Sequence, residues 1–307
     1  MSRKSECKYR HFFIHPQILG EKTAYFSIFK HFSASGASKN PSDNLILTPQ
    51  ALVEAFPRVW QIPTAKMTET LHIIPLRTVR FNDRNSILSA YSLERGPLSL
   101  TIPEGKGKGA VRARALTAPL TLIEAEVDIR PGRTIYPLRD PRAILPLSSV
   151  RSNPVKIAIS QFLAEVLASM FREGQPDEIL YRFVADSIEI LDSLEMGRIA
   201  NFHLCFLYHL SHIVGVGPDL SGWSEGSVFD LREGRYTCVL PPHPDFLAPA
   251  ESATARILDR LSYPTMHLLR LNREQRNRIL DIELQFLSIH YSSLASLKST
   301  EVLRSLF

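Results

Sequence analysis

Two sequence textures divide this chain, and the charge balance changes where they meet. Between residues 67 and 138, apolar and polar residues alternate in short runs separated by turn residues, which is typical of β-strands. From residue 153 onward, apolar residues recur at helical spacing. Residues 67–156 carry 14 Lys and Arg against 8 Asp and Glu, whereas residues 157–307 carry 13 against 19. We therefore expect a small basic β-unit joined to an acidic helical body.

The β-unit is predicted to be a closed barrel of the OB type. Five short strands fit within about 80 residues, and a basic Gly-Lys-Gly-Lys-Gly loop follows the third strand. The loop is not a phosphate-binding P-loop, because neither lysine is followed by Ser or Thr. The predicted strands cover residues 70–78, 86–92, 98–102, 120–129 and 133–138. We assign residues 67–150 to this barrel domain.

Residues 151–307 are predicted to form a mainly α-helical domain, so the fold class is α+β. The first helix should begin at Asn153-Pro154, because Asn is a good N-cap and Pro suits the first helical position. Further helices are expected at about 178–194, 198–214, 250–261, 272–291 and 297–307. A short hairpin is expected around Glu233-Gly234, as an insertion among the helices.

The first 66 residues lack sustained periodicity and differ from the rest of the chain. Because clean alternation starts at Met67, we interpret residues 1–66 as a poorly ordered extension or a mis-called start. The three cysteines, at positions 7, 205 and 238, are far apart in the sequence. This spacing argues against a disulfide framework and a thiolate zinc site. No apolar run approaches the ~20 residues of a membrane span, and a reducing cytoplasm is the simplest location.

Several segments, taken in order, resemble the RecO family of bacterial recombination mediators, most closely its Bacteroidetes-type members. The barrel segments are LRTVRFNDRNSILSAYSLERG (76–96) and APLTLIEAEVDIR (118–130). The helical segments are ISQFLAEVLASMFREGQPDEILYRFVADSIEILD (159–192), ANFHLCFLYHLSHIVGVGPDL (200–220), FDLREGRY (229–236), LRLNREQRNRIL (269–280) and LKSTEVLRSLF (297–307). The resemblance covers about residues 67–307.

The resemblance implies an N-terminal OB-fold, a helical C-terminal domain and no catalytic activity. It implies binding to single- and double-stranded DNA, annealing of complementary strands, and contacts with RecR and the single-strand-binding protein SSB. A functional link to the RecA recombinase and a nucleoid-associated place in the cytoplasm are also implied. Many family members carry a four-cysteine zinc motif, but the corresponding loop here (215–240) holds only Cys238. We therefore expect no metal and no cofactor.

A set of cations in the barrel is the candidate DNA-binding site. Cations at phosphate spacing bind nucleic acid, and arginine also stacks on bases. The alternative is an ordinary solvated face, but placement in the loops of an OB barrel favours DNA. Tyr91 and Phe81 could stack on bases, although packing in the core or in a turn is favoured for both. The set comprises Arg77, Arg80, Arg84, Lys106, Lys108, Arg112 and Arg114.

A second basic group lies in the helical domain and is a weaker candidate for binding phosphate or an acidic peptide such as the SSB tail. It comprises Arg270, Arg273 and Arg276, with Arg278 nearby. Arg273 and Arg276 are three residues apart and would share a helical face. A solvated surface with local pairs to Glu274 and Asp281 is favoured instead.

Two further groups have simpler structural interpretations. Cys205, His209 and His212 have metal-like helical spacing, but their apolar neighbours favour packing. Three acidic residues at two-residue spacing, Glu124, Glu126 and Asp128, could suggest a nuclease metal site, but one exposed strand face explains them. The leading hypothesis is a non-enzymatic DNA-repair mediator. A metal-dependent nuclease or phosphodiesterase and a protein-only adaptor remain the alternatives.

Overall fold

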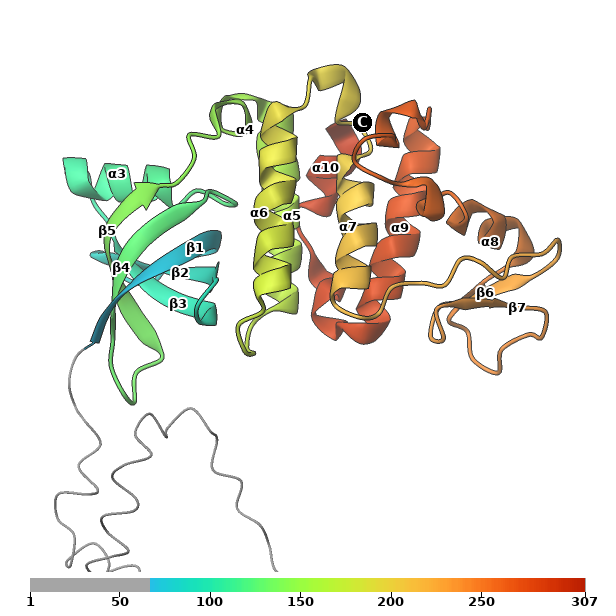
Figure 1. The fold of residues 1–307 in the computed structure, drawn as a ribbon, viewed down its shortest axis with the longest axis horizontal. Helices are drawn as coiled ribbons and strands as arrows, with labels where there is room; N and C mark the ends of the chain where they lie inside the picture. The colour runs from blue at the N-terminus through green and yellow to red at the C-terminus, as the bar shows by residue number, and fades with distance from the viewer. Residues whose placement is uncertain (1–66, 307) are drawn as a thin grey trace, which may run out of the picture. The chain divides into compact units, whose positions relative to one another are not determined.

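The computed structural model describes residues 67–306, except the side chains of residues 67, 295 and 296. Residues 1–66, which we interpreted as a poorly ordered extension or a mis-called start, lie outside the described residues. The chain first forms a closed barrel with the strand order β1-β2-β3-β5-β4, in which only β3 and β5 run parallel (Figure 1). A helix, α3 (Lys108–Leu116), connects β3 to β4. This is the OB arrangement, so the predicted barrel is confirmed. The strands are β1 (Met67–Arg80), β2 (Asn85–Ser92), β3 (Gly96–Pro103), β4 (Ile123–Ile129) and β5 (Ile135–Ala143).

Alternating apolar residues fill the barrel, as expected for a barrel of this size. They form a separate buried cluster made of Leu71, Ile73, Leu88, Ala90, Leu100, Ile102, Ile123, Ala125 and Val127. The fourth strand begins three residues later than predicted because Leu120 has a positive φ of 57°, which interrupts extended backbone. The fifth strand also begins later than predicted and extends to Ala143.

A β-bulge in β1 determines which of its residues face outward. The pairing with β2 passes from Pro75 opposite Ala90 to Arg77 opposite Ser89, so Leu76 is an extra residue. A bulge reverses the alternation of a strand. Odd-numbered residues therefore point into the barrel before the bulge and away from it afterwards. The bulge thus places Arg77 on the outer surface of the barrel.

The helical region follows the predicted pattern closely. Asn153 caps α5 by accepting hydrogen bonds from the backbone amides of Val155 and Lys156. The helix expected at 250–261 ends at Ala255, because the chain tightens there into i→i+3 hydrogen bonds. The α-helices are α4 (Ser148–Ser152), α5 (Pro154–Met170), α6 (Glu178–Ser193), α7 (Phe202–Ile213), α8 (Pro249–Ala255), α9 (Arg273–His290) and α10 (Thr300–Leu306). The 3₁₀ turns are η2 (Met196–Arg198), η3 (Leu258–Arg260), η4 (Met266–Leu268) and η5 (Ser292–Ser296).

A small sheet is inserted between α7 and α8. Its strands are β6 (Val228–Asp230), β7 (Arg235–Thr237) and β8 (Phe246–Leu247), in the order β7-β6-β8. The hairpin predicted around Glu233-Gly234 is confirmed, and β8 is an additional strand. The sheet lies at the far end of the helical region from the barrel (Figure 1).

The outer side of the barrel and the helices share a second hydrophobic core, distinct from the cluster inside the barrel. Ile74 and Tyr91, on the outer side of the barrel, belong to the same buried cluster as Leu167 of α5. The Tyr91 ring meets Phe171 edge-on, with centroids 5.9 Å apart, and its hydroxyl accepts a hydrogen bond of 3.0 Å from the Asp177 amide. Packing is therefore confirmed as the role of Tyr91. We call this contact of Ile74 and Tyr91 with Leu167 and Phe171 the seam. The seam covers one end of the outer surface formed by β1, β2 and β3.

A buried lysine stabilises the end of α6. The Lys156 ammonium, on α5, donates to the carbonyls of Asp192 and Leu194 and to the Ser149 hydroxyl at 2.6–2.9 Å. These carbonyls lie where α6 ends and would otherwise lack donors. Burial lowers the pKa of Lys156.

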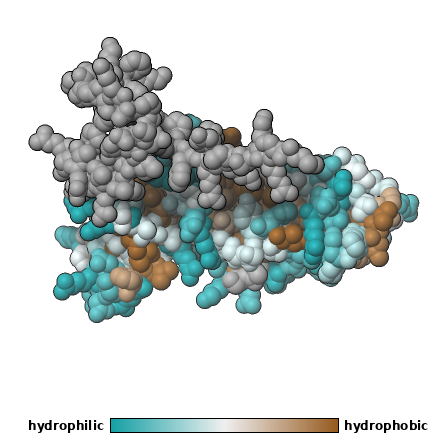
Figure 2. Space-filling model, turned by 90° about the horizontal axis from the view of Figure 1, so that it is seen from below, coloured by the Kyte–Doolittle hydropathy of each residue, from teal (hydrophilic) through white to brown (hydrophobic). Residues whose placement is uncertain are grey.

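On the part of the surface that is coloured in Figure 2, hydrophilic residues lie between the hydrophobic patches. Among the helices of residues 67–306, none has the length and hydropathy to cross a bilayer.

Candidate nucleic-acid interface

The predicted cations occupy β1, the β1–β2 turn, the segment after β3, and α3. Arg80 and Arg84 flank the turn between β1 and β2, and Lys106 lies between β3 and α3. Lys108 is the first residue of α3, so the predicted flexible loop over residues 105–109 is shorter than expected. The helix begins at Lys108 because the Ala- and Arg-containing segment after Gly107 favours helix.

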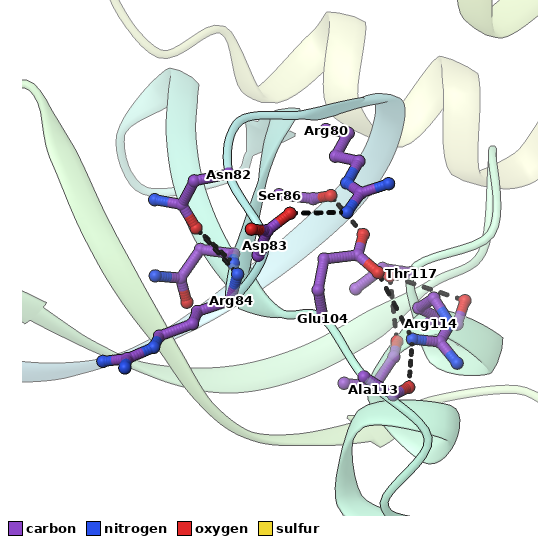
Figure 3. A network of polar contacts seen from close by, with 11 residues as sticks. Arg80, Asn82, Asp83, Arg84, Ser86, Glu104, Ala113, Arg114 and Thr117 are labelled. Atoms are coloured by element: carbon purple, nitrogen blue, oxygen red, sulfur yellow. Dashed lines mark hydrogen bonds and ion pairs between the residues drawn. The ribbon is translucent and has the colours of Figure 1, made fainter.

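A polar network connects the β1–β2 hairpin to α3 (Figure 3). Glu104, at the end of β3, accepts a hydrogen bond from the Ser86 hydroxyl and pairs with Arg114 of α3 at 3.5 Å. Arg114 also donates to the carbonyl of Gly105 at 2.8 Å. These contacts hold the start of β2, the end of β3 and α3 together. Arg114 is thus partly committed to structure, although its side chain remains 39% exposed.

The hairpin turn holds its cations in defined positions. Asn82 accepts from the amides of Arg84 and Asn85 at 2.9 and 2.8 Å, a turn typical of Asn. Arg80 pairs with Asp83 at 2.9 Å, and both side chains are largely exposed. Such a pair contributes little stability and can exchange for a phosphate. Arg84 extends its guanidinium away from this pair (Figure 3).

Three cations, at the β1–β2 turn and around the start of α3, form no ion pair with a described carboxylate. Within residues 67–306, no ion pair engages Arg84, Lys106 or Lys108, and all three are exposed. A cation that is already solvated and unpaired loses no protein contact when it binds a phosphate. These residues are therefore the most available for binding a polyanion.

An exposed apolar strip runs beside these cations. Val79 lies opposite Ile87 in the β1–β2 ladder, on the outer surface that the bulge establishes. Val79 is 49% exposed, and Phe81, at the start of the turn, is 66% exposed. The expectation that Phe81 packs in its turn is therefore wrong. The strip offers a face on which bases could stack, and OB-folds commonly bind oligonucleotides on strands 2 and 3 and the loop between strands 1 and 2.

Arg77 lies apart from the hairpin cations, near the seam with the helices. Its charge acts on Glu165 of α5. Burial opposes ionisation of Glu165, but hydrogen bonds from Ser299 and from the Lys298 amide, together with the charge of Arg77, keep its pKa below the usual value. Arg77 borders the open part of the outer surface on its helical side.

Arg112 lies on the other flank of α3 and faces β5, where it lines a groove with Arg142. The candidate set predicted from the sequence did not include Arg142, nor Arg130 and Arg133 around the β4–β5 turn. The clustering of arginines around Pro131-Gly132 in the sequence could have indicated them. Loops between strands 4 and 5 also bind ligands in OB-folds. The seven predicted cations therefore do not form a single trough.

The second predicted basic group does not form one surface. Arg276 is 8% exposed and donates to the Asn201 side chain at 3.0 Å and the Leu271 carbonyl at 2.8 Å. It is a core residue, so its assignment as a partner contact is corrected. Arg273, which is exposed, donates to the carbonyl of Arg304 at 3.1 Å.

Local pairing in this group also differs from the expectation. Arg278 pairs with Glu251 of α8, and Asp281 pairs with Arg304 of α10. Both pairs connect α9 to other helices. Arg270 is exposed, between η4 and α9.

The candidate metal groups have structural roles. Asp128 is 1% exposed, accepts from the Thr68 hydroxyl at 2.8 Å and pairs with Arg139 at 2.9 Å. It is therefore not part of an exposed acidic face, unlike Glu126. Cys205 is fully buried, which raises the pKa of its thiol. Over the described part of the chain, no three acidic, His or Cys residues are grouped to hold a metal ion.

Comparison with known proteins identifies the family. A family model described as "Recombination protein O C terminal" matches residues 151–301. A relative from Phocaeicola vulgatus, described as DNA repair protein RecO, is 33% identical over 234 residues, covering 76% of this chain and 97% of the relative. The chain belongs to the RecO family of DNA repair proteins. RecO relatives from Bacteroides fragilis and Porphyromonas gingivalis are 34% and 32% identical, with the same coverage. Membership in the RecO family agrees with the barrel-then-helices order of the structure.

Proposed function

We propose that this protein is a non-enzymatic mediator of recombinational DNA repair that binds DNA on its barrel. The observation that supports it best is the strip of exposed Val79 and Phe81 with partly exposed Ile87, beside cations that have no carboxylate partner among residues 67–306. Single-stranded DNA needs this combination of a stacking surface and phosphate contacts. Bases would stack on Phe81, and Arg84 and Lys106 would contact the backbone.

The proposed mechanism is electrostatic. Cations of the barrel offset the repulsion between the phosphates of two strands, and the strands then pair through their own bases. Binding should weaken steeply with salt, because each contacted phosphate releases counterions. The acidic helical body would repel DNA and hold partner proteins, for which RecR and SSB are our candidates, so that RecA can be loaded. The protein would act in the cytoplasm, at the nucleoid.

Charge reversal tests the site. Replacing Arg80, Arg84, Lys106 and Lys108 with Glu should abolish annealing of complementary oligonucleotides while leaving the melting temperature nearly unchanged. The expected stability follows from the exposure of all four side chains. A matched control reverses four exposed arginines of the helical region, Arg182, Arg198, Arg235 and Arg260. Annealing by the folded barrel variant at the control's rate would reject the site.

Stacking has its own test. Phe81→Ala should weaken binding of an oligo-dT strand by about 1–3 kcal/mol, the usual contribution of one stacked base. Leu268→Ala, which removes a side chain that is 67% exposed in the helical region, is the control. Equal affinities of the two variants would remove Phe81 from the site.

The alternatives are separated by direct assays. Labelled DNA incubated with Mg²⁺ or Mn²⁺ should remain intact, whereas a nuclease would cut it. A salt titration of DNA binding distinguishes the mediator from a protein-only adaptor, because the adaptor would show no salt-dependent affinity.

A further inference from the structure

Two arginines of α3 point to opposite flanks of the helix. Arg112 and Arg114 are two residues apart, which places their side chains about 200° apart around an α-helix. Ala113, between them, is buried and marks the side of α3 that faces the barrel. Arg114 therefore reaches the hairpin side, where it meets Glu104. Arg112 reaches the side of β5.

A groove of about 430 Å³ separates α3 from β5 on that side. Its lining includes Pro103, Arg112, Leu138, Asp140, Pro141 and Arg142. Apolar groups thus form part of the walls, and two guanidinium groups provide positive charge. No carboxylate forms an ion pair with Arg112 or Arg142 anywhere in residues 67–306, in contrast to Arg139 of the same strand, which pairs with Asp128.

The backbone at the groove is also unusual. Asp140 has a φ of 40°, in the left-handed region that non-glycine residues rarely adopt. Strained residues of this kind are concentrated at binding sites. The conformation falls between two paired stretches of β5, since Arg139 and Arg142 are both in register with β4. Asp140 is one of the residues that line the groove, and its carboxylate is a potential acceptor for N–H groups of a ligand.

We propose that the α3–β5 groove holds a nucleotide of a second DNA strand, while the hairpin side of α3 holds the first. The phosphate binds between Arg112 and Arg142, the sugar and base pack on Pro103, Leu138 and Pro141, and Asp140 accepts a base N–H. A volume of this size suits a small-molecule-sized group.

The separation of the two sites supports the assignment to a second strand. An α-helix with its side chains is about 10–12 Å across. Two backbones on opposite flanks of α3 are therefore separated by at least the ~10 Å over which 0.1 M salt screens charge, so both can bind despite their like charge. This inference rests on the proposed function, because it requires that the barrel bind DNA.

The test uses the full chain and two oligo-dT strands, one labelled with a fluorescent donor and one with an acceptor. Because oligo-dT strands do not pair with each other, energy transfer reports two strands on one protein, with a monomeric state verified by light scattering. Arg112→Gln combined with Arg142→Gln should abolish energy transfer by weakening the second strand about tenfold or more. The first strand, titrated alone, should bind within about twofold of the wild-type affinity.

A matched control and three outcomes make the result decisive. Arg182→Gln with Arg198→Gln removes the same charge from exposed arginines of the helical region, outside the groove lining, and should retain energy transfer. Unchanged energy transfer in the groove variant overturns the inference, as does an equal loss of first-strand affinity, which would mean that one strand spans both flanks. If the wild-type protein binds no oligo-dT at all, the proposed function itself fails.

Discussion

Gly96 provides the sharpest test of how the barrel is joined to the helices. It begins β3 with a φ of +67°, and a Cβ atom placed there would lie 2.9 Å from the carbonyl oxygen of Gln175 and 3.0 Å from the backbone nitrogen of Pro176. These atoms belong to the segment that leads into α6. Since all are backbone atoms, no side chain can rotate away to make room. We predict that Gly96→Ala forces the barrel and the helices apart at this point.

The magnitude follows from comparison with Gly132. Gly132 has a similar φ of +75°, but a Cβ there would meet nothing within 4 Å. Gly132→Ala should therefore cost only the strain of a left-handed alanine, about 1–2 kcal/mol, partly offset by the reduced entropy of the unfolded chain, about 0.4–1 kcal/mol. Gly96→Ala adds overpacking of about 1–3 kcal/mol. We expect a total cost of about 2–4 kcal/mol for Gly96→Ala.

Urea unfolding followed by circular dichroism measures both variants against the wild type. The difference between the two variants isolates the contact with Gln175 and Pro176, because the backbone strain is common to both. Equal free energies of unfolding for the two variants would refute the reasoning. That result would mean that a Cβ atom at position 96 does not collide with the backbone of Gln175 and Pro176.

Three other substitutions test buried polar groups. Burial raises the pKa of Glu283, so the folded protein retains a proton that the unfolded chain releases; the contribution of this group to stability should be fully present at low pH and fall above about pH 4.3, by up to about 1.4 kcal/mol per pH unit. Glu283→Gln should remove this contribution, so the free energy of unfolding of the wild type relative to the variant should fall between pH 4 and 8 in urea titrations, and a pH-independent difference would contradict the raised pKa. Lys156→Met leaves the Leu194 carbonyl without its donor and should cost about 1–3 kcal/mol by the same measurement, whereas an unchanged stability would deny the lysine its capping role. Tyr91→Phe removes the acceptor for the Asp177 amide and should lower the free energy of unfolding by about 1 kcal/mol, and a neutral result would contradict that hydrogen bond.

Local patterns were enough to predict the barrel and the helices. The strands expected over residues 86–92 and 98–102 are present as β2 and β3, and Asn153-Pro154 starts α5 as its capping chemistry requires. The bulge in β1 was not predicted. Its trace in the sequence is the run Ile73-Ile74-Pro75-Leu76, where four apolar residues interrupt the alternation. Such a run does not reveal which residue is the extra one, because that depends on the pairing with β2.

The sequence did not reveal how the candidate cations are arranged in space. No helix was expected after the loop of residues 105–109, so Arg112 and Arg114 were put in one set, whereas α3 separates their side chains by about half a turn. Arg276 resembles Arg273 in the sequence, yet only the former meets Asn201 of the loop before α7 and becomes buried. Burial of a charged side chain depends on partners far along the chain, so spacing alone cannot predict it.

The shared core limits where a DNA strand can lie on the barrel. Because Ile74 and Tyr91 pack into the helical cluster, the outer surface of β1 and β2 opens only beyond the bulge. Arg77 stands at that border and interacts with the acidic Glu165, whereas the turn with Arg84 is at the free end. The charge of the neighbouring surface therefore changes from balanced, where Arg77 and Glu165 offset each other, to positive along the strip that contains Val79. A polyanion on this strip is favoured more at the hairpin end than at the seam, so a bound strand should leave the barrel toward α3 and the groove beside it.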